Sequence, residues 1–260
     1  MDFVKTENND TVAGLREELY QSLSAPIDAM WEILYISNSE HYLIQDKEEC
    51  LGYCCVTDQN SLIQLYLKKV YRYATDEVVK QLIAQKIIAS ASLSSNEPIA
   101  FNAFLKISKS KDVNTFCFQH VNEEMKLESE LNLELVTEES ILDIKLFLKT
   151  QLGMDDTFGY TENLVRRKEI FMLKESGLIV ATSELIMSDT QVEIADLGVI
   201  VNRDFQGKGL ATQILKTQVN RVLKRGRKPI CSTTLDNVAS QKAITKSGFY
   251  CSNIIFDMTF

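Results

Sequence analysis

Two glycines separated by a single residue mark a place where this chain could hold a phosphate group. They lie in Gln206-Gly207-Lys208-Gly209-Leu210-Ala211, between an apolar run at residues 192–201 and a helical pattern at residues 210–224. Glycine lets successive backbone NH groups turn inward, and the positive end of the following helix attracts an anion. The sequence therefore predicts that this loop binds a diphosphate without a metal ion.

Two other phosphate-binding motifs do not fit the same residues. A P-loop requires Ser or Thr after its Gly-Lys pair, and here Gly209 follows Lys208. A dinucleotide fingerprint requires Gly or Ala at position 212, where Thr212 stands, and an acidic ribose ligand in the unit that follows. The loop therefore belongs to a different class of phosphate site.

A second motif lies downstream of the loop. It begins with Asn237-Val238-Ala239-Ser240 and ends with Gly248-Phe249. A Gln-x-x-Gly-x-Ala loop after a long strand, followed by an Asn-x-x-Ser helix that ends in Gly-Phe, resembles the GNAT superfamily of N-acetyltransferases. In that family Arg or Gln opens the loop and Gly or Ala closes it, so Gln206 and Ala211 are both allowed. The resemblance covers residues 131–260.

The periodicity of the C-terminal half predicts the elements of an α/β fold. Alternating and helical patterns follow one another in the order strand, two helices, three strands, helix, strand, helix, strand. Strands are expected at residues 131–136, 169–173, 178–187, 192–201, 229–234 and 249–260, and helices at residues 138–152, from 161, at 210–224 and at 237–247. We predict a central mixed, mostly antiparallel sheet flanked by helices.

The N-terminal half repeats this order faintly, which predicts two tandem GNAT-like domains. Residues 42–57 match a C-terminal hairpin, and residues 61–68 match the strand before the loop. We place the domains at residues 1–125 and 131–260, with the charged stretch 122–130 between them. The alternative is that the N-terminal half is an unrelated α/β cap.

The N-terminal segment equivalent to the phosphate loop differs in chemistry. Residues 71–77 contain no glycine and carry Asp76 and Glu77, whose charges would repel a diphosphate. We therefore expect the N-terminal copy to be degenerate and to have lost CoA binding. It would shape the acceptor cleft or pack against the active copy.

The family resemblance implies an acetyl-CoA site in the C-terminal domain. The strand before the loop would pair its backbone with the pantetheine arm of the cofactor, as an added strand would. The loop would hold the pyrophosphate, and the start of the next helix would face the cofactor from the other wall. The residues implied are Val199, Ile200, Val201, Gln206, Gly207, Lys208, Gly209, Leu210, Ala211, Asn237 and Ser240.

Direct transfer of acetyl to a primary amine needs a base near the amine. Glu193 lies thirteen positions before Gln206 (206 − 193), which resembles the place of the catalytic glutamate in histone-type family members. Asp196 is the alternative on the same strand. Many relatives protonate the leaving thiolate with a Tyr four residues before the Gly-Phe pair, where this chain has Ile244. The conceivable replacements are Tyr160, Tyr250 and Cys231.

Charge and composition limit the classes of partner that we expect this chain to bind. The 260-residue chain has a formal net charge of −8, which argues against non-specific binding of nucleic acid. Six Cys lack zinc-knuckle spacing and only two His occur, so no metal is expected and the thiols should be reduced and buried. The chain has no long apolar run, so we expect a cytoplasmic protein without membrane contact. The tandem arrangement favours a monomer and leaves a dimer open.

Three functions fit these observations. The leading one is an N-acetyltransferase that uses acetyl-CoA and a small-molecule or peptide amine. The others are a non-catalytic CoA-binding regulatory or scaffolding protein, and an acyltransferase with an amino-acyl donor, because peptidoglycan-bridge transferases also carry tandem copies. The acceptor would be selected by residues 153–160, where Asp155 and Asp156 could attract a cationic amine.

Overall fold

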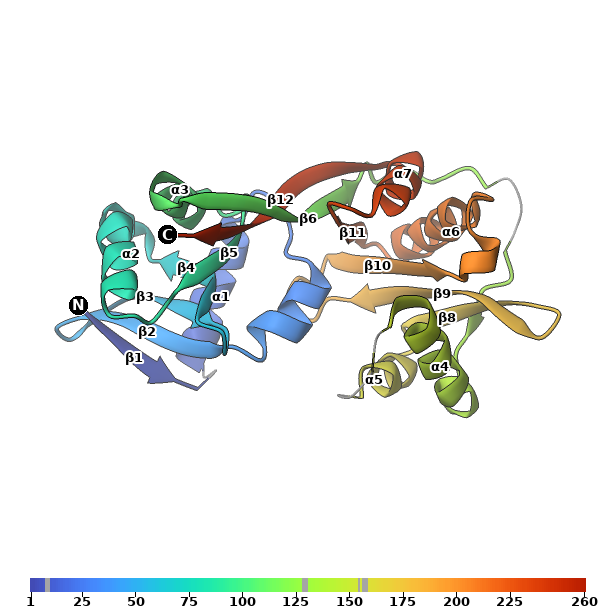
Figure 1. Ribbon diagram of the computed structural model, residues 1–260, viewed down its shortest axis with the longest axis horizontal. Coiled ribbons are helices and arrows are strands. Elements are labelled where there is room, and N and C mark those ends of the chain that lie inside the picture. Colours follow the sequence, from blue (N-terminus) through green and yellow to red (C-terminus); the bar gives the residue numbers. More distant parts are fainter. Residues whose placement is uncertain (8–9, 128–130, 154, 156–158) are drawn as a thin grey trace. The chain divides into compact units, whose positions relative to one another are not determined.

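The chain folds into two compact units. The computed structural model describes residues 1–7, 10–127, 131–153, 155 and 159–260 (Figure 1). The first unit comprises Met1–Cys117 together with Cys251–Phe260, and the second comprises Phe118–Tyr250. Within the described residues, no helix is both long and apolar enough to cross a membrane.

The first unit is built around a mixed sheet with strand order β1-β2-β3-β4-β5-β12-β6. Strands β1 to β4 pair antiparallel, β4 and β5 pair parallel, and β5 pairs antiparallel with β12. The strands are β1 (Asp2–Thr6), β2 (Glu40–Asp46), β3 (Glu49–Val56), β4 (Ser61–Leu67), β5 (Ser90–Ser94), β6 (Ser110–His120) and β12 (Phe249–Thr259). The helices are α1 (Asp10–Ser22), η1 (Trp31–Ile36), η2 (Lys69–Ala74), α2 (Thr75–Ala84) and α3 (Pro98–Ile107).

Strand β3 shows how the sheet of the first unit separates two hydrophobic clusters. Successive side chains of a strand point to opposite faces. Cys54 therefore packs into a cluster with Val78 of α2 and Phe104 of α3, whereas Cys55 packs into a second cluster with Leu15 of α1. All six cysteines are free thiols, and Cys251 is exposed rather than buried.

The second unit is a sheet with strand order β11-β10-β9-β8-β7. In Figure 1, α6 and α7 lie on one face of this sheet, and α4 and α5 lie on the other. The strands are β7 (Glu134–Leu135), β8 (Ile170–Glu175), β9 (Leu178–Met187), β10 (Ile194–Val201) and β11 (Lys228–Thr234). The helices are η3 (Glu138–Ser140), α4 (Ile141–Leu152), α5 (Tyr160–Arg167), η4 (Arg203–Phe205), α6 (Leu210–Lys224) and α7 (Val238–Lys246).

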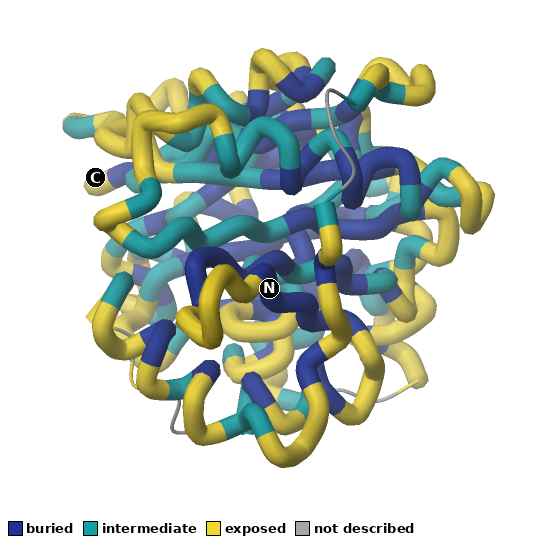
Figure 2. Tube along the Cα trace, turned by 90° about the vertical axis from the view of Figure 1, so that its right-hand side faces the viewer, coloured by how far each residue is buried: buried dark blue, intermediate teal, exposed yellow. Residues whose placement is uncertain are grey.

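Helix α6 illustrates why the second unit could be predicted well. Its apolar residues recur at helical spacing, and Ile214, Leu215, Val219 and Val222 are all buried. The helix ends at Lys224, and Gly226 follows with a left-handed backbone, at φ of 70°. Glycine adopts this conformation at little steric cost. Figure 2 shows how burial varies along the described trace, with buried segments in the interior and exposed ones at the loops.

The predicted element order and fold class are confirmed. The predicted strand at 131–136 is reduced to β7, and the last predicted element is a single strand. The compact units differ from the predicted division at 125/131, because residues 251–260 are part of the first unit and residues 118–125 are part of the second. Pairing of Ile255 with Ser94 and of Thr259 with Ser90 explains the assignment of the last strand.

Met258 tests this assignment of the last strand. Its side chain is 0% exposed in the hydrophobic cluster of the first unit. We expect Met258→Ala to lower the free energy of unfolding by about 2–5 kcal/mol, because it removes buried methylenes and leaves a cavity. Leu105→Ala, at a residue 39% exposed on α3, is the control and should cost much less. Equal losses in urea unfolding would contradict the packing of β12.

Candidate active site

The site begins where two parallel strands part. Strand β10 pairs with β11 at Ile194, Ala195 and Asp196, and the described pairing extends no further along β10. The same strand stays paired with β9 through Val201 without a change of register. The end of β10 therefore presents one edge to β9 and the other edge to an opening. We call this opening between β10 and β11 the strand gap.

A cavity of ≈ 350 Å³ lies along the strand gap. Every cofactor-binding residue predicted from the sequence lines it, except Lys208, which lines a neighbouring cavity of ≈ 200 Å³. Gln151 and Leu152, at the end of α4, also line the larger cavity and were not predicted. The structure thus brings together a strand edge, a glycine loop and the start of α7.

The glycine loop has the backbone that the sequence predicts. Gly207 and Gly209 both have positive φ, at 76° and 80°. Gly209 precedes α6, and none of the described side chains caps the start of that helix. The amide of Gln206 donates to the Val201 carbonyl at 3.0 Å and ties the loop to the strand. The first NH groups of α6 are therefore left for an external acceptor.

The electrostatics around α6 favour an anion. The first turn of this helix contains no acidic residue in the described structure. Lys208, Lys216 and Lys246 line the neighbouring cavity together with Gly209. Cations and a helix N-terminus both attract negative charge, so this corner suits phosphate groups.

Asn237 at the start of α7 acts as a helix cap. Its side-chain oxygen accepts from the Ser240 backbone NH at 3.1 Å. Asn237 and Ser240 also line the cavity opposite β10. Asn237 therefore caps α7, and it also lines the cavity where the predicted cofactor contact would lie.

The peptide between Gly198 and Val199 is held in a defined orientation. The Ser183 hydroxyl of β9 donates to the Gly198 carbonyl at 2.9 Å, and the buried Gln218 amide of α6 donates to that hydroxyl at 3.1 Å. In a planar trans peptide the NH points opposite to the carbonyl. The Val199 NH is therefore directed away from β9, toward the strand gap.

A carboxylate that sequence reasoning missed lies beside this peptide. Glu184 on β9 stands opposite Gly198 in the register, and its Oε2 is 3.1 Å from where a Cβ on Gly198 would be. The Tyr160 hydroxyl, from the first residue of α5, donates to Oε2 at 3.0 Å. Burial raises the pKa of Glu184, and the Tyr160 hydrogen bond opposes this rise. The available signal was a glutamate within the apolar run of β9.

Glu193, the predicted base, stands elsewhere. Its side chain is 70% exposed and pairs with Lys228 at 2.6 Å, and this hydrogen bond holds the pKa of the carboxyl below its usual range. At about 3.3 Å per strand residue, roughly 20 Å separates Glu193 from Val199. Asp196 is buried where β10 still pairs with β11. Along the chain, both positions lie farther from Val199 than Gly198, the residue that Glu184 faces, so the register does not favour them.

The candidate proton donors are dispersed. Ile244 is buried, as is Cys231, while Tyr250 is exposed at 51%. Tyr160 contacts Glu184, which stands opposite Gly198 of β10. Of the predicted acceptor loop, Asp155 pairs with Lys149 at 2.8 Å, whereas Met154, Asp156 and Thr157 lie outside the described residues.

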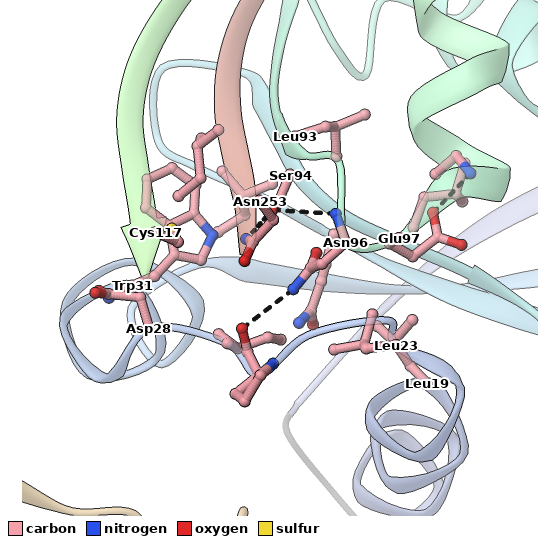
Figure 3. A pocket seen from close by; sticks show the side chains of 17 residues that line it. Leu19, Leu23, Asp28, Trp31, Leu93, Ser94, Asn96, Glu97, Cys117 and Asn253 are labelled. Atoms are coloured by element: carbon pink, nitrogen blue, oxygen red, sulfur yellow. Dashed lines mark hydrogen bonds between the residues drawn. The ribbon is translucent and has the colours of Figure 1, made fainter. Parts of the chain in front are cut away.

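The N-terminal copy has the same parting of strands but a filled cleft. Strand β4 pairs with β5 at Ser61 and Leu62, and the described pairing goes no further. The cavity beyond measures only ≈ 40 Å³. Figure 3 shows Asn96 pointing toward the segment at 25–26, where its amide donates to the carbonyls of Ala25 at 3.0 Å and Pro26 at 3.3 Å. The chain itself thus occupies the space that is open in the C-terminal copy.

The helix after β4 also carries the wrong charge for an anion. The segment equivalent to the glycine loop is η2, which runs directly into α2. Asp76 and Glu77 lie in the first turn of α2, and Asp76 pairs with Lys106 at 2.9 Å. These carboxylates would repel a diphosphate, as predicted from the sequence.

Comparison with known proteins identifies the family. An acetyltransferase (GNAT) domain model matches residues 105–250, more than half of the chain, and another acetyltransferase (GNAT) domain model matches residues 8–121. The chain therefore belongs to the GNAT acetyltransferase family, and the predicted tandem arrangement is confirmed. The protein is an acetyltransferase. Comparison with curated proteins gives no significant match.

Solved structures extend the likeness over the whole chain. A GNAT-family acetyltransferase from Colwellia psychrerythraea is 28% identical, with a TM-score of 0.94 and 100% of both chains covered. A GCN5-related N-acetyltransferase from Sphaerobacter thermophilus is 14% identical, with a TM-score of 0.66 over 98% of this chain and 94% of that one. A tandem GNAT protein of clavulanic acid biosynthesis is 12% identical, with a TM-score of 0.63 over 100% and 98%. The last two support the fold alone.

Asn96 tests the filled cleft of the N-terminal copy. It is 3% exposed, so Asn96→Ala would leave two carbonyls without their donor in a buried site. We expect the free energy of unfolding to fall by about 1–3 kcal/mol. The control is Asn38→Ala, because the exposed Asn38 amide also donates to a carbonyl, that of Leu34, at 2.9 Å. If both variants unfold at the same urea concentration, the segment at 24–26 is not anchored as described.

Proposed function

We propose that the protein binds one acetyl-CoA in its C-terminal copy and transfers the acetyl group directly to a primary amine. The single observation that carries this proposal is the cavity along the strand gap. It joins the free edge of Val199–Val201 to the uncapped start of α6 through the loop Gln206–Ala211. An elongated molecule with an amide chain at one end and a diphosphate at the other complements those two features.

Each part of the cofactor has a counterpart in the chain. The backbone of Val199 to Val201 would pair with the pantetheine arm, and the NH groups of the loop and of α6 would hold the pyrophosphate. Lys208, Lys216 and Lys246 lie close enough to the loop to attract the remaining phosphate charge. Asn237 and Ser240 would bound the arm on the opposite wall.

The chemistry requires little covalent help from the protein. An amine nitrogen attacks the thioester carbonyl carbon, the carbonyl oxygen gains negative charge, and the carbon–sulfur bond then breaks. The Val199 NH, directed into the strand gap, would donate to the oxygen as its charge develops. The thiolate of the leaving group has a modest basicity, which permits it to depart before it is protonated.

Gly207→Glu tests the placement of the diphosphate. No described atom lies within 4 Å of where a Cβ on Gly207 would stand, so the substitution adds charge without a steric clash in the fold. We expect calorimetric titration of the wild type to give one equivalent of bound acetyl-CoA. Gly207→Glu should weaken binding at least tenfold, because the carboxylate repels the pyrophosphate.

Gly226→Glu is a matched control at the other end of α6. Gly226 also has a positive φ, at 70°, and also has no described atom within 4 Å of a built Cβ. Both variants therefore carry the same backbone strain and the same charge. Equal acetyl-CoA affinities in the two variants would refute the placement. Binding in the wild type without turnover on any amine would instead favour the non-catalytic CoA-binding protein.

A further inference from the structure

We propose that Glu184 is the catalytic base that removes the proton from the incoming amine, and that Tyr160 positions its carboxylate. This inference rests on the proposed acetyl transfer from acetyl-CoA. It names residues for which neither motif gives a sign, since Glu184 lies on β9 and Tyr160 at the start of α5.

Glu184 stands opposite Gly198, and its Oε2 lies over the α-carbon of Gly198, where a side chain would otherwise be. The next residue, Val199, directs its NH into the strand gap. Consecutive α-carbons are about 3.8 Å apart, so the residue that Glu184 faces is the immediate neighbour of the residue whose NH would meet the thioester oxygen.

The side chain of Glu184 lies on a defined face of the sheet. Ser183 contacts Gln218 of α6, so the neighbouring Glu184 points to the opposite face. That face is covered by α4 and α5, and Tyr160 of α5 contacts the carboxylate there. An amine that approaches from the side of α4 and α5 would meet Glu184 before it reaches the strand gap.

The surroundings of the Glu184 carboxylate suit a base. The cross-strand neighbours of Glu184 are Ile170 on β8 and Gly198 on β10, and neither titrates. Among the described residues, Tyr160 is the titratable group that contacts the carboxylate. Glu184 is intermediate in exposure, between the buried residues Ser183 and Leu185. A carboxylate with a raised pKa is a stronger base near neutral pH than an ordinary one.

A primary ammonium ion gives one proton to the Glu184 carboxylate and becomes a neutral amine. Its nitrogen bonds to the acetyl carbon, the carbon–sulfur bond breaks, and the second nitrogen proton passes to the departing thiolate sulfur. The products are the acetamide and CoA thiol, and Glu184 later releases its proton to water. The substrate class is thus a primary amine that arrives as a cation.

The test compares Glu184→Gln with the wild type, using acetyl-CoA, a panel of primary alkylamines and hydroxylamine, which is already neutral at pH 7. We expect kcat/KM for the best alkylamine to fall about 100-fold or more at pH 7, as for loss of a general base. The rate with hydroxylamine and the affinity for acetyl-CoA should stay within about threefold, because neither needs the base. Glu175→Gln, on an exposed strand end, is the matched control.

The pH profile separates a base from a merely structural residue. With the wild type, kcat/KM for the alkylamine should rise with pH through the raised pKa of Glu184 and then level off. With Glu184→Gln it should rise about tenfold per pH unit up to the pKa of the amine, so the defect shrinks as pH increases. Tyr160→Phe should keep the levelling off and move it to higher pH, because it removes the hydrogen bond that lowers the Glu184 pKa.

These measurements separate an error in the assignment of Glu184 from an error in the proposed acetyl transfer. If acetyl-CoA does not bind, or binds without acetylation of any amine or hydroxylamine, both proposals are wrong. If the wild type acetylates alkylamines and Glu184→Gln does so equally well, the base is another residue and the acetyl transfer stands. Loss in Glu193→Gln, with Glu184→Gln unaffected, would likewise overturn the assignment in favour of the residue paired with Lys228.

Discussion

The parting of β10 from β11 after Asp196 is the constraint on which the C-terminal copy depends. A strand that loses one neighbour exposes backbone groups that need partners, and burial without them is costly. Here the pairing of β10 with β9 continues unbroken through Val201, and Ser183 with Gln218 fixes the peptide at the start of the strand gap. The strand gap can therefore stay open without loss of order in the strand.

The two copies differ in what lies beside the parted end of the strand, β4 in one and β10 in the other. In the N-terminal copy, Asn96 anchors the segment at 24–26 in the cleft, and the remaining cavity is ≈ 40 Å³. In the C-terminal copy the equivalent space measures ≈ 350 Å³. The space beside the parted strand is thus largely filled in the N-terminal copy and open in the C-terminal copy. In the proposed function, the C-terminal copy is the one that binds acetyl-CoA.

Charge reinforces this division. The first turn of α2 carries Asp76 and Glu77, whereas the start of α6 lies near Lys208, Lys216 and Lys246. A helix N-terminus attracts anions only if its own side chains do not supply them. The carboxylate of Glu184 lies on the other face of the sheet, where it contacts Tyr160. In the proposed complex, the phosphates would lie near these lysines and the cationic amine near the Glu184 carboxylate.

The sequence by itself determined the elements with local signals. Glycines at 207 and 209 permit the left-handed backbone that both adopt, and the periodicity of α6 predicts its residues, so the loop and its helix could be placed without a structure. The contact between Glu184 and Gly198 could not, because these residues meet through strand pairing across a hairpin. Likewise, nothing local links Thr259 to Ser90. Contacts between residues distant in the chain depend on register and packing, which only the tertiary structure decides.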